Sequence, residues 1–98
     1  MIKINIKKDL IIIEGHSNYS EYGTDIVCAS ISSISITTIN ALLRLDNECN
    51  KYEEKDGFIK IDILKHNNYV DILIENMIDL LKELEKQYKK NIKVNEEV

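Results

Sequence analysis

The segment from about Asp25 to Leu45 is apolar around most of a helical circumference, and this feature constrains the fold more than any other. Two apolar faces leave only a narrow polar strip, which consists of Ser30, Ser33, Thr37, Asn40 and Arg44. Either Thr24 or Asp25 suits the N-cap, because both side chains accept hydrogen bonds from first-turn N–H groups. A helix with this composition is typically central and buried. The segment therefore predicts a helix that other elements must cover.

Segments with period-two alternation surround this helix and predict strands. An Asp-Gly pair within the turn Lys55-Asp56-Gly57 predicts a hairpin between two of them. A second helix, from about Tyr69 to Tyr88, shows three- and four-residue apolar spacing, and Asn67 or Asn68 can cap it. The predicted strands are Ile2–Ile6, Leu10–Glu14, Cys49–Glu54, Phe58–Ile63 and residues 92–94.

The resulting element order is β-β-α-β-β-α-β, which predicts an α+β fold. We expect a mostly antiparallel sheet with both helices on one face. The 98 residues are enough for a single domain covering residues 1–98. An apolar fraction of 44% with 31% charged residues is typical of a globular protein.

Charge and hydropathy disfavour several classes of function. The net charge of −4 argues against a nucleic-acid-binding surface, which needs clustered Lys and Arg. No run approaches the roughly 18 consecutive apolar residues of a membrane helix, so no membrane association is expected. The alternating N-terminus does not resemble a signal peptide. Two cysteines are too few for a disulfide scaffold, and we expect a cytoplasmic protein.

Cys28 and His16 are candidates for nucleophilic chemistry. A thiol attacks as the thiolate, and an ordinary cysteine is only a few per cent ionised at pH 7. A helix beginning at Asp25 would place Cys28 in its first turn, where the helix dipole favours an anion by about 0.3–1 kcal/mol. Because that is too little, a cationic neighbour is needed. His16 ends the second strand, and a loop of residues 17–24 would return the chain to the helix beside it.

Structural roles for the same residues remain open at this point. Cysteine is often a buried core residue, and a histidine at a strand end is often a surface or hydrogen-bonded residue. Asp25 also fits a simple N-cap, and Ser32 fits close helix packing. Cys49 and His66 lie in different predicted elements without the short ligand spacing of a zinc site, so no metal and no cofactor are expected.

The stretch from Gly15 to Ser32 resembles the bacterial ribosomal-processing cysteine protease family. That family carries Gly-His, a loop of about this length, then Gly-x-Asp-Ile-Val-Cys-Ala and a serine four residues after the cysteine. The matching residues here are Gly15-His16, Gly23-Thr24-Asp25-Ile26-Val27-Cys28-Ala29 and Ser32. Ser17 and Ser30 replace alanines that are common in the family, which leaves the reactive groups intact and affects only local packing. Downstream of about Leu45 the sequence offers no motif.

The resemblance implies a homodimeric protease that removes an N-terminal extension from a large-subunit ribosomal protein during ribosome assembly. By position, Cys28 is the implied nucleophile and His16 the implied general base. Asp25 and Ser32 match further motif positions with supporting roles. First-helix backbone N–H groups are candidate oxyanion donors. The loop from Ser17 to Thr24 is expected to close over the peptide substrate.

Two other classes of function are left open by the residues. One is a non-enzymatic assembly factor that binds a ribosomal protein or peptide by its sheet edge, with Cys28 merely buried. The other is an RNA-binding accessory protein, which the negative charge disfavours.

Overall fold

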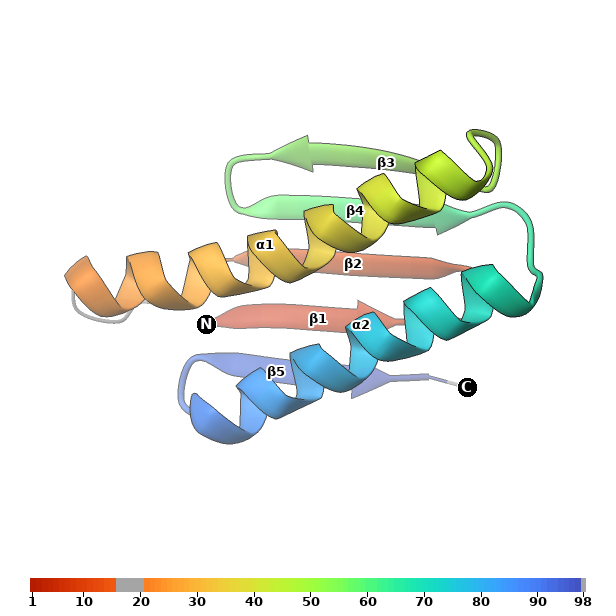
Figure 1. Ribbon diagram of the computed structural model, residues 1–98. Helices are drawn as coiled ribbons and strands as arrows, with labels where there is room; N and C mark the ends of the chain where they lie inside the picture. The colour runs from red at the N-terminus through yellow and green to blue at the C-terminus, as the bar shows by residue number, and fades with distance from the viewer. Residues whose placement is uncertain (16–20, 98) are drawn as a thin grey trace.

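The computed structural model describes residues 1–15 and 21–97, with side chains described for residues 1–15 and 26–97. Five strands and two helices follow one another in the predicted order (Figure 1). They are β1 (Ile2–Ile6), β2 (Leu10–Gly15), α1 (Glu21–Leu45), β3 (Asn50–Lys55), β4 (Phe58–Ile63), α2 (Asn68–Gln87) and β5 (Ile92–Glu96).

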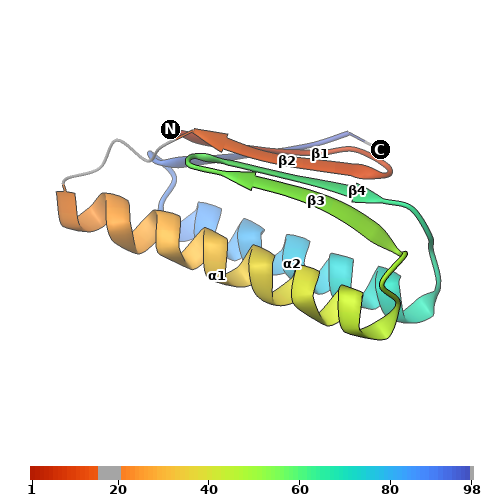
Figure 2. The same ribbon diagram turned by 90° about the horizontal axis from the view of Figure 1, so that it is seen from above.

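The strands form one sheet in the order β3-β4-β2-β1-β5. Every neighbouring pair is antiparallel except β1 and β5, which run parallel because the chain crosses over through α2 before it returns. Seen from the side, both helices lie on the same face of the sheet (Figure 2). The α+β fold, the mostly antiparallel sheet and the placement of the helices are therefore confirmed.

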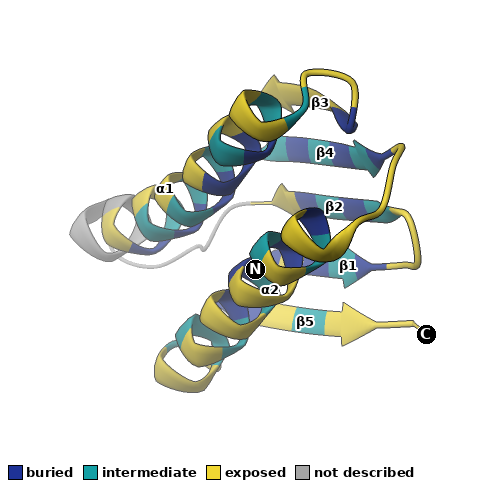
Figure 3. Ribbon diagram, turned by 45° about the vertical axis from the view of Figure 1, so that its right-hand side comes forward, coloured by how far each residue is buried: buried dark blue, intermediate teal, exposed yellow. Residues whose placement is uncertain are grey.

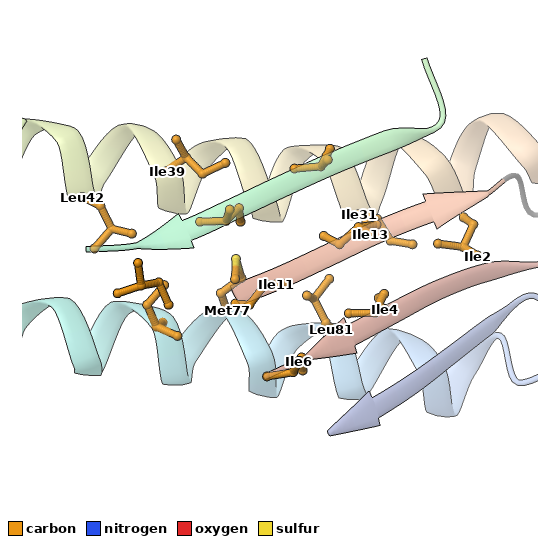
Figure 4. Close-up of a cluster of buried hydrophobic side chains, with 14 of the residues drawn as sticks. Ile2, Ile4, Ile6, Ile11, Ile13, Ile31, Ile39, Leu42, Met77 and Leu81 are labelled. Atoms are coloured by element: carbon orange, nitrogen blue, oxygen red, sulfur yellow. The ribbon is translucent and has the colours of Figure 1, made fainter. Parts of the chain in front are cut away.

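The core lies between this face of the sheet and the helices (Figures 3 and 4). Because side chains alternate between the two faces of a strand, every second residue points toward the helices. Burying each of these side chains stabilises the fold by roughly 1.5–3 kcal/mol. The buried strand residues are Ile2, Ile4, Ile6, Ile11, Ile13, Ile59, Ile61, Ile63 and Ile92, and the helices add Val27, Ile31, Ile39, Leu42, Val70, Ile74, Met77 and Leu81.

Local signals in the sequence determine two of the boundaries. Asp56-Gly57 forms the two-residue turn between β3 and β4, with Gly57 at φ 71°. Asn67 caps α2, and its side-chain Oδ1 accepts a 3.0 Å hydrogen bond from the Val70 backbone N–H.

Helix α1 is not enclosed on all sides, so the expectation of a central, buried helix was wrong. With only two layers, one side of each helix faces outward. The segment Ile26–Leu45 has a mean hydropathy of 1.8, and only 33% of it is buried. By length and composition alone it would also qualify as a membrane span, which the count of consecutive apolar residues did not reveal because Ser, Thr and Asn interrupt it. Here its inner side packs on the sheet as part of the core.

Candidate active site

Cys28 lies at the edge of the buried side of α1. Its neighbours Val27 and Ile31 are 0% and 2% exposed, whereas Cys28 is half-buried and packs against the core from its rim. The thiol is therefore held by core packing and remains accessible. This position differs from that of Cys49, which is 0% exposed and whose Sγ donates a hydrogen bond to the Leu42 carbonyl oxygen at 3.4 Å.

The helix begins at Glu21, four residues earlier than expected. In the segment Glu21-Tyr22-Gly23-Thr24 only Gly23 is a strong turn former, and a glycine costs a helix only about 1 kcal/mol relative to alanine, which does not stop it. Cys28 consequently lies roughly two turns inside the helix rather than in its first turn. The expectation that Cys28 lies in the first turn, where the helix dipole favours a thiolate, was therefore wrong. The dipole effect is confined to the terminal turn, and only the first four N–H groups of a helix lack intrahelical acceptors.

A cleft of about 570 Å³ opens next to Cys28, between the first half of α1 and one end of the sheet. In Figure 1 the end of β2, the β3–β4 turn and the start of β1 lie at this same end of the molecule. The cleft is lined by Ile2, Ile13, Gly15, Cys28, Ile31, Ser32, Glu54, Lys55, Asp56, Gly57, Phe58 and Ile59. The lining residues include a cysteine, a serine and three residues of charged type, Glu54, Lys55 and Asp56.

The diagonal course of α1 explains why the cleft is there. The helix passes over the beginning of β3 and moves away from that strand toward the other end of the sheet (Figure 1). The exposure of the β3 side chains rises along the strand as the helix moves away from it. On the side of β3 that faces the helices, Asn50 is 4% exposed, Tyr52 is 45% exposed and Glu54 is exposed.

Gly15 fixes the backbone at the floor of the cleft. Its φ is +109°, and a Cβ atom there would overlap the backbone carbonyl oxygen of Met1. Its N–H donates a 2.9 Å hydrogen bond to the carbonyl oxygen of Gly57 in the β3–β4 turn. A residue with a side chain would be strained at this φ. The backbone hydrogen bond to Gly57 therefore holds Gly15, which directly precedes His16 in the sequence, in the lining of the cleft.

The predicted site residues fall into three groups. Cys28 and Ser32, one turn apart on α1, line the cleft together. His16 and the loop residues 17–20 lie outside the described residues. Asp25 belongs to α1 by its backbone, as do residues 21–24, so the second half of the predicted loop is helical, and the expected loop boundary at Thr24 was wrong.

Ser30 is accommodated within the helix. Its Oγ donates a 2.8 Å hydrogen bond to the Ile26 carbonyl oxygen four residues earlier. The hydroxyl that replaces the family's alanine is thus satisfied locally, away from the cleft lining.

Sequence reasoning missed the acidic residues Glu54 and Asp56. Both line the cleft, although no motif was found downstream of Leu45. The sequence alone carried no signal for this, because the pairing register is needed to show which side of β3 Glu54 faces. Glu54 follows Asn50 and Tyr52 at two-residue steps along β3, so the three side chains point to the same, core-facing side of the strand. A charged residue is unusual there unless that side is open.

His66 lies at the opposite end of the sheet and forms a structural link. Its Nδ1 is 2.8 Å from Asp71 Oδ1 and its Nε2 is 2.6 Å from Asp9 Oδ1, which joins the start of α2 to the β1–β2 turn. The hydrogen bonds with Asp71 and then Asp9 raise the pKa of His66 above its usual 6.5.

Within residues 1–15 and 26–97, no group of three His, Cys, Asp or Glu side chains is arranged to hold a metal ion.

An α+β fold that presents an accessible cysteine beside a cleft defines a candidate thiol hydrolase. The family described as cysteine protease Prp matches residues 1–93, and the chain belongs to that family. The ribosomal processing cysteine protease Prp of Staphylococcus aureus (strain Mu50) is 32% identical over 88 residues, which cover 87% of this chain and 83% of the relative. The Bacillus subtilis (strain 168) protein of the same name is 29% identical over 87 residues, covering 82% and 78%.

Solved structures agree with this assignment. The S. aureus ribosomal processing protease Prp in complex with a covalently linked product peptide superimposes with a TM-score of 0.83 at 27% identity, covering 98% of this chain and 97% of that one. The same protease with a substrate peptide gives a TM-score of 0.82 at 26% identity, with the same coverage. SMU.848 from Streptococcus mutans gives 0.76 at 26% identity, covering 97% and 90%.

Family membership decides between the enzyme and the non-enzymatic alternative. The chain is a cysteine protease, and its relatives act in ribosomal processing.

Proposed function

We propose that this protease removes the N-terminal extension of a large-subunit ribosomal protein during ribosome assembly, with Cys28 as nucleophile and His16 as general base. One observation carries the proposal. In a chain of the Prp family, Cys28 is the cysteine that lines a cleft, whereas Cys49 is fully buried. The S. aureus relative, which binds a substrate peptide and a covalently linked product peptide, supports a peptide as the occupant of such a cleft.

The proposed chemistry follows from the two groups. The thiolate of Cys28 attacks the scissile carbonyl carbon and forms an S–C bond while the carbonyl oxygen takes the negative charge. When the C–N bond breaks, the imidazolium of His16 gives its proton to the leaving amine. A water molecule that His16 deprotonates then attacks the thioester, which releases the acid product and restores the thiol.

Gly15 supports the role proposed for His16. Its backbone lines the cleft and is held by the hydrogen bond to Gly57, and it directly precedes His16 in the sequence. Ser32 is the proposed supporting group on α1, since its side chain lines the same cleft one turn after Cys28. Asp25 is the second supporting group by motif position, and the segment that begins at Ser17 is proposed to cover the bound peptide.

Peptide cleavage tests the proposal directly. A peptide spanning the junction between the extension and the mature ribosomal protein is incubated with the enzyme and analysed by mass spectrometry. We expect one cut at the junction, and no cut with Cys28→Ala or His16→Ala. Normal cleavage by Cys28→Ala would refute the assignment of the nucleophile.

Alkylation supplies an internal control for the nucleophile. Iodoacetamide applied to the native protein should modify the half-buried Cys28 and leave the fully buried Cys49 unmodified. Peptide mapping distinguishes the two sites. Preferential labelling of Cys49 would contradict the accessibility on which the mechanism depends.

A homodimer in the cytoplasm completes the proposal. Exposed apolar side chains on the helices support self-association, with Leu45 55%, Tyr69 70% and Ile72 61% exposed. Two free cysteines fit a reducing compartment. Light scattering should give twice the 11.4 kDa mass of one chain, and a single-chain mass at all concentrations would refute the dimer. A fluorescent fusion that is exported from the cytoplasm would refute the location.

A further inference from the structure

The β3–β4 hairpin gives the cleft an acidic wall. Glu54 and Asp56 both line the cleft. Lys55 lies between them, but its Nζ is 3.5 Å from Glu53 Oε1, so these two opposite charges pair with each other. Among the residues with described side chains, neither Glu54 nor Asp56 forms an ion pair. Two carboxylates are therefore available to something that enters the cleft.

The register of the sheet determines where Glu54 faces. Glu54 pairs with Ile59 of β4, and directly opposed residues point to the same face of a sheet. Ile59 is 5% exposed and belongs to the core beneath the helices. Glu54 is thus on the helix-bearing face, the same side from which Cys28 and Ser32 of α1 line the cleft.

A carboxylate at this position is not explained by packing. Core-facing positions of a strand normally carry apolar side chains, as Ile59, Ile61 and Ile63 do on β4. Because α1 has diverged from β3 at this point, Glu54 is left exposed. Because Glu54 and Asp56 line the same cleft, both negative charges favour a cation that enters it.

We propose that Glu54 is a specificity-determining residue that binds a Lys or Arg side chain of the peptide substrate, with Asp56 adding negative charge at the rim. This inference rests on the proposed function, because it assumes that a peptide occupies the cleft beside Cys28. Glu54 and Cys28 line one cleft of about 570 Å³, and an extended chain advances about 3.3 Å per residue. The selected cation therefore lies near the scissile bond, and the residues on each side of that bond are the positions to test.

The test is a lysine scan read by binding rather than by cleavage. Peptides carry glutamine at all polar positions except one lysine, which moves through the three residues on each side of the junction. Affinities are measured by fluorescence anisotropy on Cys28→Ala, which binds without cutting. We expect one lysine position to bind tightest and Glu54→Gln to weaken that peptide about fivefold, the upper range for a solvent-accessible ion pair. Glu54→Lys should reverse the preference toward a peptide with glutamate at that position.

Glu75→Gln is the matched control. Glu75 is an exposed carboxylate on α2 outside the cleft lining, and its substitution changes the net charge equally. We expect it to alter the affinity for every peptide by the same small factor. Equal effects of Glu54→Gln and Glu75→Gln, or equal loss for all lysine positions, would overturn the inference. Unchanged melting temperatures establish that the variants are folded.

The design separates this inference from the proposed function. If the wild-type chain fails to cleave the junction peptide but Glu54 still selects one lysine position, the proposed function fails and the inference stands. If Cys28-dependent cleavage occurs and Glu54→Gln changes no preference, the inference alone fails.

Discussion

Replacing Gly15 by alanine tests how the backbone beneath the cleft is held. The residue has φ +109°, and the added Cβ would overlap the Met1 carbonyl oxygen at the start of β1. Relief would require the paired ends of β1 and β2, where Ile2 lies opposite Gly15, to move apart. The hydrogen bond from Gly15 N–H to Gly57 would be strained by the same movement.

The magnitude follows from these two effects. An L-residue held at positive φ costs about 1–2 kcal/mol, and forcing a backbone carbonyl away adds a similar amount, comparable to overpacking a core. The total of roughly 2–4 kcal/mol is a large part of the stability of roughly 5–15 kcal/mol expected for a small domain. At about 4–8 °C per kcal/mol, the melting temperature should fall by at least about 8 °C.

Thermal unfolding followed by circular dichroism measures the effect. Glu14→Ala is the control, because Glu14 is the exposed neighbour in β2 and its replacement should change stability by less than about 0.5 kcal/mol. If Gly15→Ala melts within about 3 °C of the wild type, the backbone is not constrained as described. Below its melting temperature, the variant should also cleave the junction peptide more slowly, since residue 16 follows directly.

Three further substitutions address other parts of the fold. Asn67→Ala removes the cap of α2 and should reduce the free energy of unfolding by about 1 kcal/mol in urea titrations. Met77→Ala empties a fully buried site and should cost about 2–5 kcal/mol by the same method. Because its folded-state pKa is raised, the stabilisation from His66 is fully present below about pH 6.5 and is lost as pH rises through the folded-state value. His66→Gln should therefore destabilise the protein at pH 5.5 by up to about 1 kcal/mol, because solvent screening limits the strength of these exposed ion pairs, and much less at pH 9. Equal effects at both pH values would contradict the link with Asp9 and Asp71.

Most of the fold was predictable because its strands and helices carry strong local signals. The alternating isoleucines of β1 and β4 predicted strands whose bounds the structure reproduces. Asp56-Gly57 predicted the hairpin, and of the two candidate caps of α2, Asn67 and Asn68, the structure uses Asn67. The parallel pairing of β1 with β5 was not predictable in this way, because it depends on the path of a crossover rather than on any local pattern.

The candidate site was predictable in its chemistry but less so in its geometry. Cys28 stood out through the motif, yet its place in the helix was wrong because the helix start is marked only by weak signals near Gly23. The acidic wall at Glu54 was missed because a charged residue in a strand is usually a solvated one. Only the register with Ile59 and the divergence of α1 reveal that it faces the cleft.

The pairing of β1 with β5 has a consequence for when the enzyme can become active. Ile2, which lines the cleft, pairs with Ile92, and its N–H donates to the carbonyl oxygen of Asn91. Contacts this distant in sequence form slowly and require nearly the whole polypeptide. A nascent chain still lacking its last strand would leave β1 as an unprotected edge and the cleft floor unsupported. Translation must therefore reach β5 before the strand that supports the cleft floor can pair and the cleft can be complete.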